Sequence, residues 1–169
     1  MPSTEHAPRA QAPEAGTTRV VSLREITDVN VRAVCALEVE ETQKRNVAAN
    51  AVSLAEAYVH RDAAWPRAVY AGDELVGFVM IYDPRTATEP EEPDFFLWRL
   101  MIDRRAQGRG YGRAAVHLAI EYARSRGAAR VMVSHVRETA ALGAFYASFG
   151  FAYTGREDGR ELYMALDLR

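Results

Sequence analysis

The chain has 169 residues, 49% of them apolar and 26% charged, which is the size and composition of one globular domain. Its 21 basic and 23 acidic residues give a formal net charge of −2, which argues against a basic nucleic-acid-binding protein. One cysteine excludes an internal disulfide framework, and the four histidines lack metal-ligand spacing. No apolar run or signal-peptide core is long enough for a membrane helix or a leader, so we expect a metal-free cytoplasmic protein with no membrane partner.

The start of the chain differs in composition from the rest. Residues 1–17 are rich in Pro, Ala, Thr and Glu and show no apolar periodicity. Such a segment buries too little apolar surface to fold. We therefore predict a disordered tail at 1–17 and one domain over 18–169.

The next elements in chain order are a strand and two helices. The β-branched segment 20–23 predicts a strand, and apolar residues at 31, 34, 35 and 37 predict a helix over 30–41. Ser53-Leu54-Ala55-Glu56 matches a capping box, which predicts that the second helix opens at Ser53, with Leu54, Ala57 and Tyr58 on one side.

The middle of the chain reads as a hairpin, a loop and a central strand. Two apolar runs, 67–71 and 75–82, flank Gly72-Asp73, which is typical of a β-hairpin. Prolines and acids fill 83–94 and predict an exposed loop, and the apolar run 95–102 predicts a strand.

The last third alternates helices and strands. Apolar spacing predicts a helix over 112–125 with Gly127 just beyond its end. The remaining expected elements are a strand at 131–133, a helix at 140–148, and strands at 152–154 and 162–168. The order β-α-α-β-β-β-α-β-α-β-β predicts an α/β sheet with antiparallel and parallel portions.

The most distinctive segment is Gln107-Gly108-Arg109-Gly110-Tyr111-Gly112, between a predicted strand and a predicted helix. Alternating glycines permit unusual φ values and close backbone approach, and N–H groups at a helix N-terminus bind anions. The segment lacks the Lys-Ser/Thr pair of a Walker loop, and several strands precede it, unlike a Rossmann loop. A glycine-rich turn without a ligand is the alternative.

Residues 102–112, Ile-Asp-Arg-Arg-Ala-Gln-Gly-Arg-Gly-Tyr-Gly, resemble motif A of the GNAT superfamily of N-acetyltransferases. Residues 145–151, Phe-Tyr-Ala-Ser-Phe-Gly-Phe, resemble that family's Tyr-x-x-x-Gly-Phe segment on its fourth helix. The resemblance covers about 19–169. It implies the GNAT fold, a mixed central sheet with a splayed strand pair flanked by helices, and direct acetyl transfer from acetyl-CoA to a primary amine.

The resemblance also implies roles for individual residues. Loop N–H groups would hold the pyrophosphate, the end of strand 95–102 would meet the pantetheine and polarise the acetyl carbonyl, and Tyr146 would protonate the leaving thiolate. The alternative for Tyr146 is a core tyrosine. Thr139, where many relatives have Asn, can still cap a helix. The implied acetyl-CoA-binding residues are Leu100, Met101, Ile102, Gln107, Gly108, Arg109, Gly110, Tyr111, Gly112, Thr139 and Tyr146.

A narrower resemblance concerns the acceptor. Residues 98–103 with the glycine loop, and residues 43–57, are similar to bacterial spermine/spermidine acetyltransferases. This implies a polyamine acceptor, bound by Glu38 and Glu41 on the predicted first helix and its exit. The alternative for these acids is a solvated face.

Other readings stay open at this point. The acceptor could instead be an antibiotic amine, a protein N-terminus or a lysine, and the chain could be a non-catalytic CoA-binding regulatory module. His135 is one candidate general base, and water or solvent is another. The resemblance is compatible with a homodimer.

Overall fold

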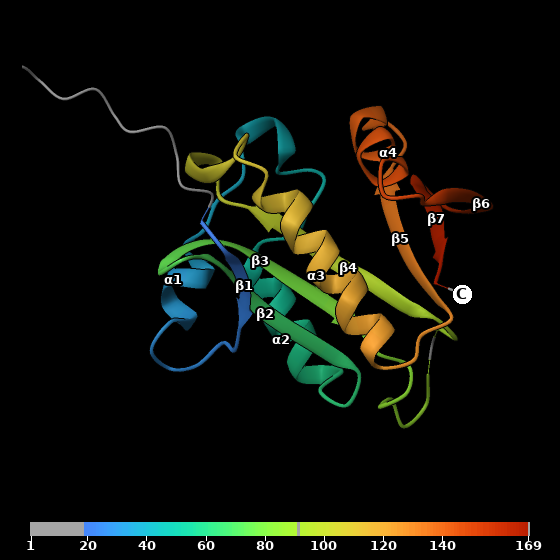
Figure 1. The fold of residues 1–169 in the computed structure, drawn as a ribbon, viewed down its shortest axis with the longest axis horizontal. Helices are drawn as coiled ribbons and strands as arrows, with labels where there is room; N and C mark the ends of the chain where they lie inside the picture. The colour runs from blue at the N-terminus through green and yellow to red at the C-terminus, as the bar shows by residue number, and fades with distance from the viewer. Residues whose placement is uncertain (1–18, 91, 169) are drawn as a thin grey trace, which may run out of the picture.

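A seven-stranded mixed sheet in the order β1-β2-β3-β4-β5-β7-β6 carries the fold in this computed structural model (Figure 1). The structure describes residues 19–90 and 92–168, so the predicted tail at 1–17 lies outside the described residues. The strands are β1 (Val21–Arg24), β2 (Ala64–Ala71), β3 (Glu74–Tyr82), β4 (Phe95–Ile102), β5 (Arg130–Val136), β6 (Ala152–Asp158) and β7 (Glu161–Asp167). Only β4 and β5 pair in parallel among these strands.

Helices cover both faces of the sheet. They are α1 (Val31–Cys35), α2 (Asn50–Val59), α3 (Tyr111–Ser125) and α4 (Ala140–Ala147), with 3₁₀ turns at Glu41–Gln43 and Arg104–Ala106. In Figure 1, α3 crosses the near face of the sheet, α2 lies behind it, and α4 stands beside the end of β5. Within 19–90 and 92–168, no helix has the length and apolarity needed to cross a bilayer.

The sheet separates two apolar cores. On the α3 side, Ala115 and Val116 pack with Val79 and Phe95, because the helix turns its small buried residues toward the strands. On the opposite side, Val34 of α1 and Ala57 of α2 pack against Phe78, Met80 and Met101. A strand with apolar residues on both faces reads as a continuous apolar run, which is why β3 and β4 were visible in the sequence.

The sheet opens between β4 and β5. These strands pair only at Phe95–Val131 and Phe96–Met132, and beyond Phe96 they diverge toward α4 (Figure 1). Among the described strands, the edge of β4 that faces β5 therefore has no partner from Leu97 onward. This confirms the splayed strand pair that the resemblance implied.

A β-bulge lies at the same place on the other edge of β4. Met80 pairs with Arg99 and Ile81 pairs with Leu97, so Trp98 has no partner on β3. Leu97 and Leu100 pack on the α3 side, whereas Trp98 packs on the α1–α2 side. The extra residue breaks the alternation of side chains, so that Trp98 and Arg99 both contact the α1–α2 side of the sheet.

The prediction of a helix over 30–41 was wrong beyond Cys35. Leu37 and Val39 are buried while Glu38 and Glu40 are exposed, a period of two that belongs to an extended segment. The backbone of Glu38 bonds to the end of β4, since its carbonyl accepts from the Arg104 N–H at 2.8 Å. These long-range hydrogen bonds replace the helical ones.

The second helix also begins earlier than predicted. It starts at Asn50, whose side-chain amide donates to the Val34 carbonyl at 2.8 Å and fastens α2 to α1. Ser53 is buried inside the helix and does not cap it, and Tyr58 is 73% exposed instead of facing inward. The hairpin and the strand at 95–102 are confirmed, whereas β5 and β6 run further than predicted.

Candidate active site

A cavity of about 1240 Å³ opens where β4 and β5 separate. β4 lines it from Leu97 to Ile102, and most of the other lining comes from the segments 42–48, 106–113 and 138–146. Every residue predicted to bind acetyl-CoA lines this cavity except Arg109, whose guanidinium donates to the Arg105 carbonyl at 3.2 Å. Residues that are far apart in the sequence are thus brought to one place.

The glycine loop presents free backbone donors to the cavity. Gly108 and Gly110 have φ values of 74° and 80°, which a side chain would strain, whereas Gly112 is helical. Gly110 is the N-cap of α3 and supplies no side chain. Among the described residues, no acceptor bonds the N–H groups from Gln107 to Gly112. Such a run of donors at a helix N-terminus fits a phosphate group.

The loop is held by the buried carboxylate of Asp103. Asp103 accepts from the Arg105 backbone at 3.0 Å, from the Arg105 guanidinium at 2.8 Å and from the Glu38 N–H at 3.2 Å. The hydrogen bond from the Arg105 side chain is the main cause that lowers the pKa of Asp103 below its usual value. The turn between β4 and the glycine loop is therefore fixed by a charged anchor.

Gln107 links the two sides of the cavity. Its side-chain nitrogen donates to the Ile102 carbonyl at 2.9 Å and to the Gln43 side-chain oxygen at 2.8 Å. The glycine loop is thereby tied both to the end of β4 and to the segment between α1 and α2. The Ile102 carbonyl lies on the edge of β4 that faces the cavity, and it already accepts the hydrogen bond from Gln107.

Tyr146 lies on α4, 7% exposed, with its ring packed against Phe145 and Phe151. It also lines the cavity, so it belongs to the core and to the site. Burial raises the pKa of Tyr146 to about 12, because the phenolate would lose its hydration. The hydroxyl therefore stays protonated at neutral pH.

His135 lies within β5, not beyond it, and is 4% exposed. Its Nδ1 is 2.9 Å from the Val136 carbonyl, which can only accept, so Nδ1 carries a proton. Its Nε2 lies 3.0 Å from the Tyr153 hydroxyl. In the neutral ring Nε2 accepts from that hydroxyl, and no lone pair is left for a substrate.

Glu38 and Glu41 lie outside the cavity lining. Glu38 pairs with Arg104 at 3.2 Å and Glu41 pairs with Lys44 at 2.7 Å. Neither residue lies on α1, contrary to the prediction, since that helix ends at Cys35.

Thr139 lines the cavity at the N-cap position of α4, but its hydroxyl does not cap the helix. Instead it donates to the Val136 carbonyl at 2.7 Å. The expectation that Thr139 caps α4 through its side chain was therefore wrong. The hydroxyl joins α4 to the end of β5.

Basic side chains outnumber acidic ones in the charged part of the lining, and Lys44, Arg45 and Arg99 were not predicted to lie here. Lys44 and Arg99 pair with Glu41 and Glu56. The basic lining residues are Lys44, Arg45, Arg99 and Arg113, and the acidic ones are Glu138 and Glu161. Glu138 is already paired with Arg160 at 2.9 Å. One signal was present in the sequence, namely an arginine in the middle of the apolar run 95–102.

Solved structures with this fold come from distant proteins. A spermidine N-acetyltransferase from Vibrio cholerae, in complex with CoA and spermine, is 16% identical with a TM-score of 0.66, covering 87% of this chain and 95% of that one. The ribosomal-protein-S18-alanine N-acetyltransferase of Escherichia coli is 19% identical with a TM-score of 0.65, covering 88% and 94%. An acetyltransferase from Thermus thermophilus is 18% identical with a TM-score of 0.65, covering 89% and 99%.

These identities establish the fold alone, and the sequence has no significant match among curated proteins. The family is established by sequence. The model of the acetyltransferase (GNAT) family matches residues 32–151, which include the splayed strands, the glycine loop and Tyr146. This chain belongs to the acetyltransferase (GNAT) family and is an acetyl-CoA-dependent acyltransferase.

Proposed function

We propose that the enzyme acetylates a primary amine by direct attack of the amine on the thioester of acetyl-CoA. One observation carries the proposal: the glycine loop apart from Arg109, with its unbonded N–H groups, the unpaired edge of β4 and Tyr146 line the same cavity. These are a donor set for a pyrophosphate, a surface for an extended pantetheine, and a proton donor for a thiolate.

The glycine loop would bind the pyrophosphate through its backbone. Its N–H groups have no acceptor in the described chain, and a Cβ added at Gly108 or Gly110 would meet no atom within 4 Å. The space above these two residues is therefore open to a phosphate. Arg109 would contribute its N–H group and not its side chain, since the guanidinium bonds within the loop.

The unpaired edge of β4 would hold the thioester. The backbone N–H of Leu100, on this edge, would donate to the acetyl carbonyl and stabilise the negative charge that develops on its oxygen. The amine nitrogen forms a bond to the carbonyl carbon, the C–S bond breaks, and the sulfur leaves with the electron pair. Tyr146 gives its hydroxyl proton to that sulfur, and the new ammonium group loses one proton to water in the open cavity.

Direct attack fits the side chains present. The only cysteine of the chain, Cys35, is exposed and lies outside the cavity lining, so it is not placed to form an acetyl-enzyme. His135 has both ring nitrogens engaged. The amine must therefore attack in its neutral form, and we expect kcat/KM to rise with pH until the amine is deprotonated.

A polyamine is one candidate for the acceptor. It is supported by the sequence resemblance and by the fold shared with the Vibrio cholerae spermidine N-acetyltransferase. With this acceptor, Glu38 and Glu41 would bind the polyamine, which requires their ion pairs with Arg104 and Lys44 to open. Arg45, which lines the cavity and pairs with no carboxylate of the described chain, weighs against a polycation.

Calorimetric titration with acetyl-CoA, followed by thiol release across a panel of amines, tests the proposal. We expect saturable binding, amine-dependent release of one thiol per acetylated amine, and no thiol burst without amine. Binding without turnover on any amine would contradict acetyl transfer. A stoichiometric burst without amine would contradict direct attack.

A further inference from the structure

Arg99 is the one charged residue of β4, and the bulge at Trp98 gives it an unusual place. Its guanidinium donates to Glu56 of α2 at 2.9 Å and to the Trp98 carbonyl at 2.8 Å. Its side chain is 21% exposed and lines the cavity. A buried strand thus carries a guanidinium to the point where the sheet opens.

The guanidinium keeps unused donors. Arginine has five N–H donors in a planar fork, and the structure gives Arg99 one partner on each terminal nitrogen. The Nε–H is buried and has no partner among the described residues. Because Nε is buried, the donors left for a ligand are the second N–H groups of the two terminal nitrogens.

Glu56 pairs with Arg99, but a second positive charge on this side of the cavity is unpaired among the described residues. Arg45, from the segment between α1 and α2, lines the same cavity and pairs with no carboxylate of the described chain. Arg99 precedes Leu100 on the strand, where the thioester would lie, and stands three residues before the strand end. At ~3.3 Å per residue it is too far from the glycine loop to serve the pyrophosphate.

We propose that Arg99 binds a carboxylate of the acceptor, so that the substrates are small amino carboxylic acids. The inference rests on the proposed acetyl transfer and names its acceptor class. A carboxylate fits the planar fork of arginine in a two-bond geometry that a monoamine or a polyamine lacks. Glu56 fixes the guanidinium from the side of α2, and the substrate carboxylate accepts from the second N–H of each terminal nitrogen.

The test compares amino acids with amines of matched length. β-Alanine, 4-aminobutyrate and 5-aminovalerate are each paired with the alkylamine and the diamine of the same chain length. We expect wild-type kcat/KM to be roughly 10-fold or more higher for the best amino acid than for its partners. Arg99→Met should lower kcat/KM for the amino acid by roughly 10- to 100-fold, the usual range for a lost charge-assisted bond. It should change kcat/KM for the alkylamine by less than about threefold.

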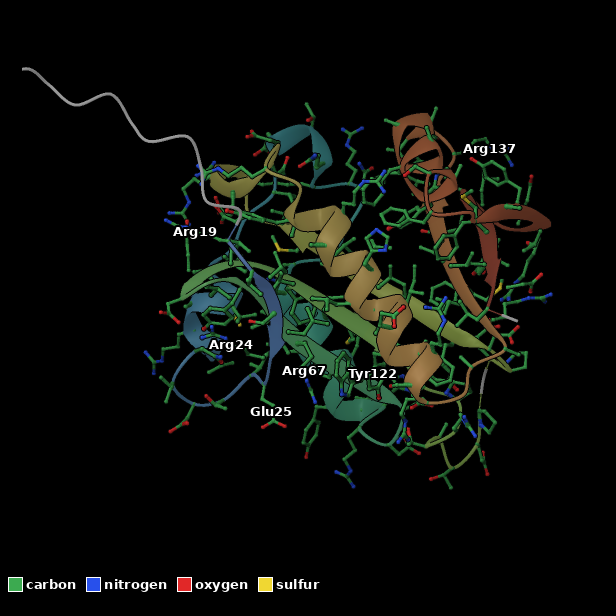
Figure 2. All side chains as sticks on the ribbon, viewed as in Figure 1. Arg19, Arg24, Glu25, Arg67, Tyr122 and Arg137 are labelled. Atoms are coloured by element: carbon green, nitrogen blue, oxygen red, sulfur yellow. The ribbon has the colours of Figure 1, made fainter. Side chains whose placement is uncertain are left out.

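Arg67→Met is the matched control. Arg67 lies on β2 with 20% of its side chain exposed, stacks on Trp65, donates to the preceding carbonyl of Pro66 and pairs with Glu25. It does not line the cavity, and Figure 2 places it near Tyr122, toward the end of α3 remote from the glycine loop. We expect this variant to leave the preference for amino acids unchanged.

A binding measurement separates recognition from folding and from turnover. Calorimetry should show that the N-acetylated amino acid binds wild type more tightly than the uncharged N-acetyl alkylamine. Arg99→Met should remove the difference, and Arg99→Lys should keep part of it, because the charge remains but the fork is lost. Thermal midpoints confirm that each variant is folded.

The outcomes distinguish this inference from the proposed function. If wild type releases thiol with diamines or alkylamines better than with amino acids, acetyl transfer stands and the carboxylate site is wrong. An equal loss on all acceptors in Arg99→Met, or no binding preference for the charged product, also overturns it. Failure to bind acetyl-CoA overturns the proposed function itself.

Discussion

The three glycines of the loop are not equivalent. Gly108 and Gly110 adopt positive φ values, whereas Gly112 lies in α3, where an added Cβ would meet Ile102 and Phe145 at 3.6 and 4.0 Å. Gly112 therefore does not depend on an unusual φ. The spacing predicted an anion-binding turn, but only backbone geometry separates the two positive-φ positions from the helical one.

Gly110→Val should weaken acetyl-CoA binding. A β-branched residue is strained at φ +80°, and its side chain would fill the space into which a phosphate would come. We expect Kd for acetyl-CoA, measured by calorimetry, to rise by roughly 10-fold or more, as for the loss of charge-assisted bonds. Gly159→Val, also at positive φ with open space but in the β6–β7 turn, is the control and should leave Kd unchanged. An unchanged Kd in Gly110→Val would refute the role of the loop.

The pKa of Tyr146 predicts the alkaline side of the pH profile. Burial raises this pKa to about 12, above the unfolded value near ~10. The proton donor therefore persists through the range in which amines deprotonate, and kcat/KM should rise without a fall up to about pH 10. The same shift stabilises the fold fully below the unfolded pKa, and this contribution is lost as pH rises from about 10 to about 12. A fall in kcat/KM near pH 8 in a folded enzyme would contradict the assignment.

At the scale of elements, β4 shows what sequence can and cannot tell. The apolar run predicted the bounds 95–102 correctly, because both faces of the strand are buried. The bulge at Trp98 was not predictable, since it depends on how β3 and β4 align. It decides which way Arg99 points, and so the presence of Arg99 at the cavity was not predictable from the sequence.

The turn after β4 depends on Asp103. Asp103→Asn removes the charge that holds the Arg105 guanidinium and weakens the bond from the Glu38 N–H. We expect a loss of about 1–3 kcal/mol in the free energy of unfolding from urea denaturation at pH 7. Asp73→Asn, at a fully exposed carboxylate in the hairpin turn, is the control and should change it by less than about 0.5 kcal/mol.

The contribution of Asp103 to the free energy of unfolding depends on pH. Its pKa is lowered on folding, chiefly by the Arg105 side chain, so its stabilisation is present above the unfolded value near ~3.9. The stabilisation is lost as pH falls through the lower folded value. Wild type and Asp103→Asn should therefore converge in stability below about pH 3.9, and a difference that stayed constant in acid would contradict the anchor.

For the whole molecule, the order of elements was predictable but the charge of the cavity was not. Hydrophobic runs and turn residues report local structure, which is why the hairpin and α3 were correctly predicted. The acids near residue 40 looked like a cation site because they are close in sequence. In the fold, Glu38 and Glu41 are paired outside the cavity, whereas Arg45 and Arg99 line it. Charges that converge from distant segments leave no local pattern.

Salt should reveal which charges govern acceptor binding. A basic lining repels a polycation, and salt screens repulsion over a Debye length of roughly 10 Å at 0.1 M. We therefore expect KM for spermidine to fall as ionic strength rises from about 0.02 to 0.3 M, with KM for butylamine as the reference. A KM for spermidine that rises with salt would instead support polyamine binding by Glu38 and Glu41.

The measurement that tests the central claim most directly is the comparison of Tyr146→Phe with wild type. The substitution keeps the ring in the core and removes the proton that the thiolate would take. We expect kcat to fall by roughly 100-fold while Kd for acetyl-CoA changes by less than about twofold. Tyr122→Phe, a tyrosine packed in the same core outside the cavity lining, should leave both values near wild type. A kcat for Tyr146→Phe within a few-fold of wild type would show that Tyr146 only packs the core.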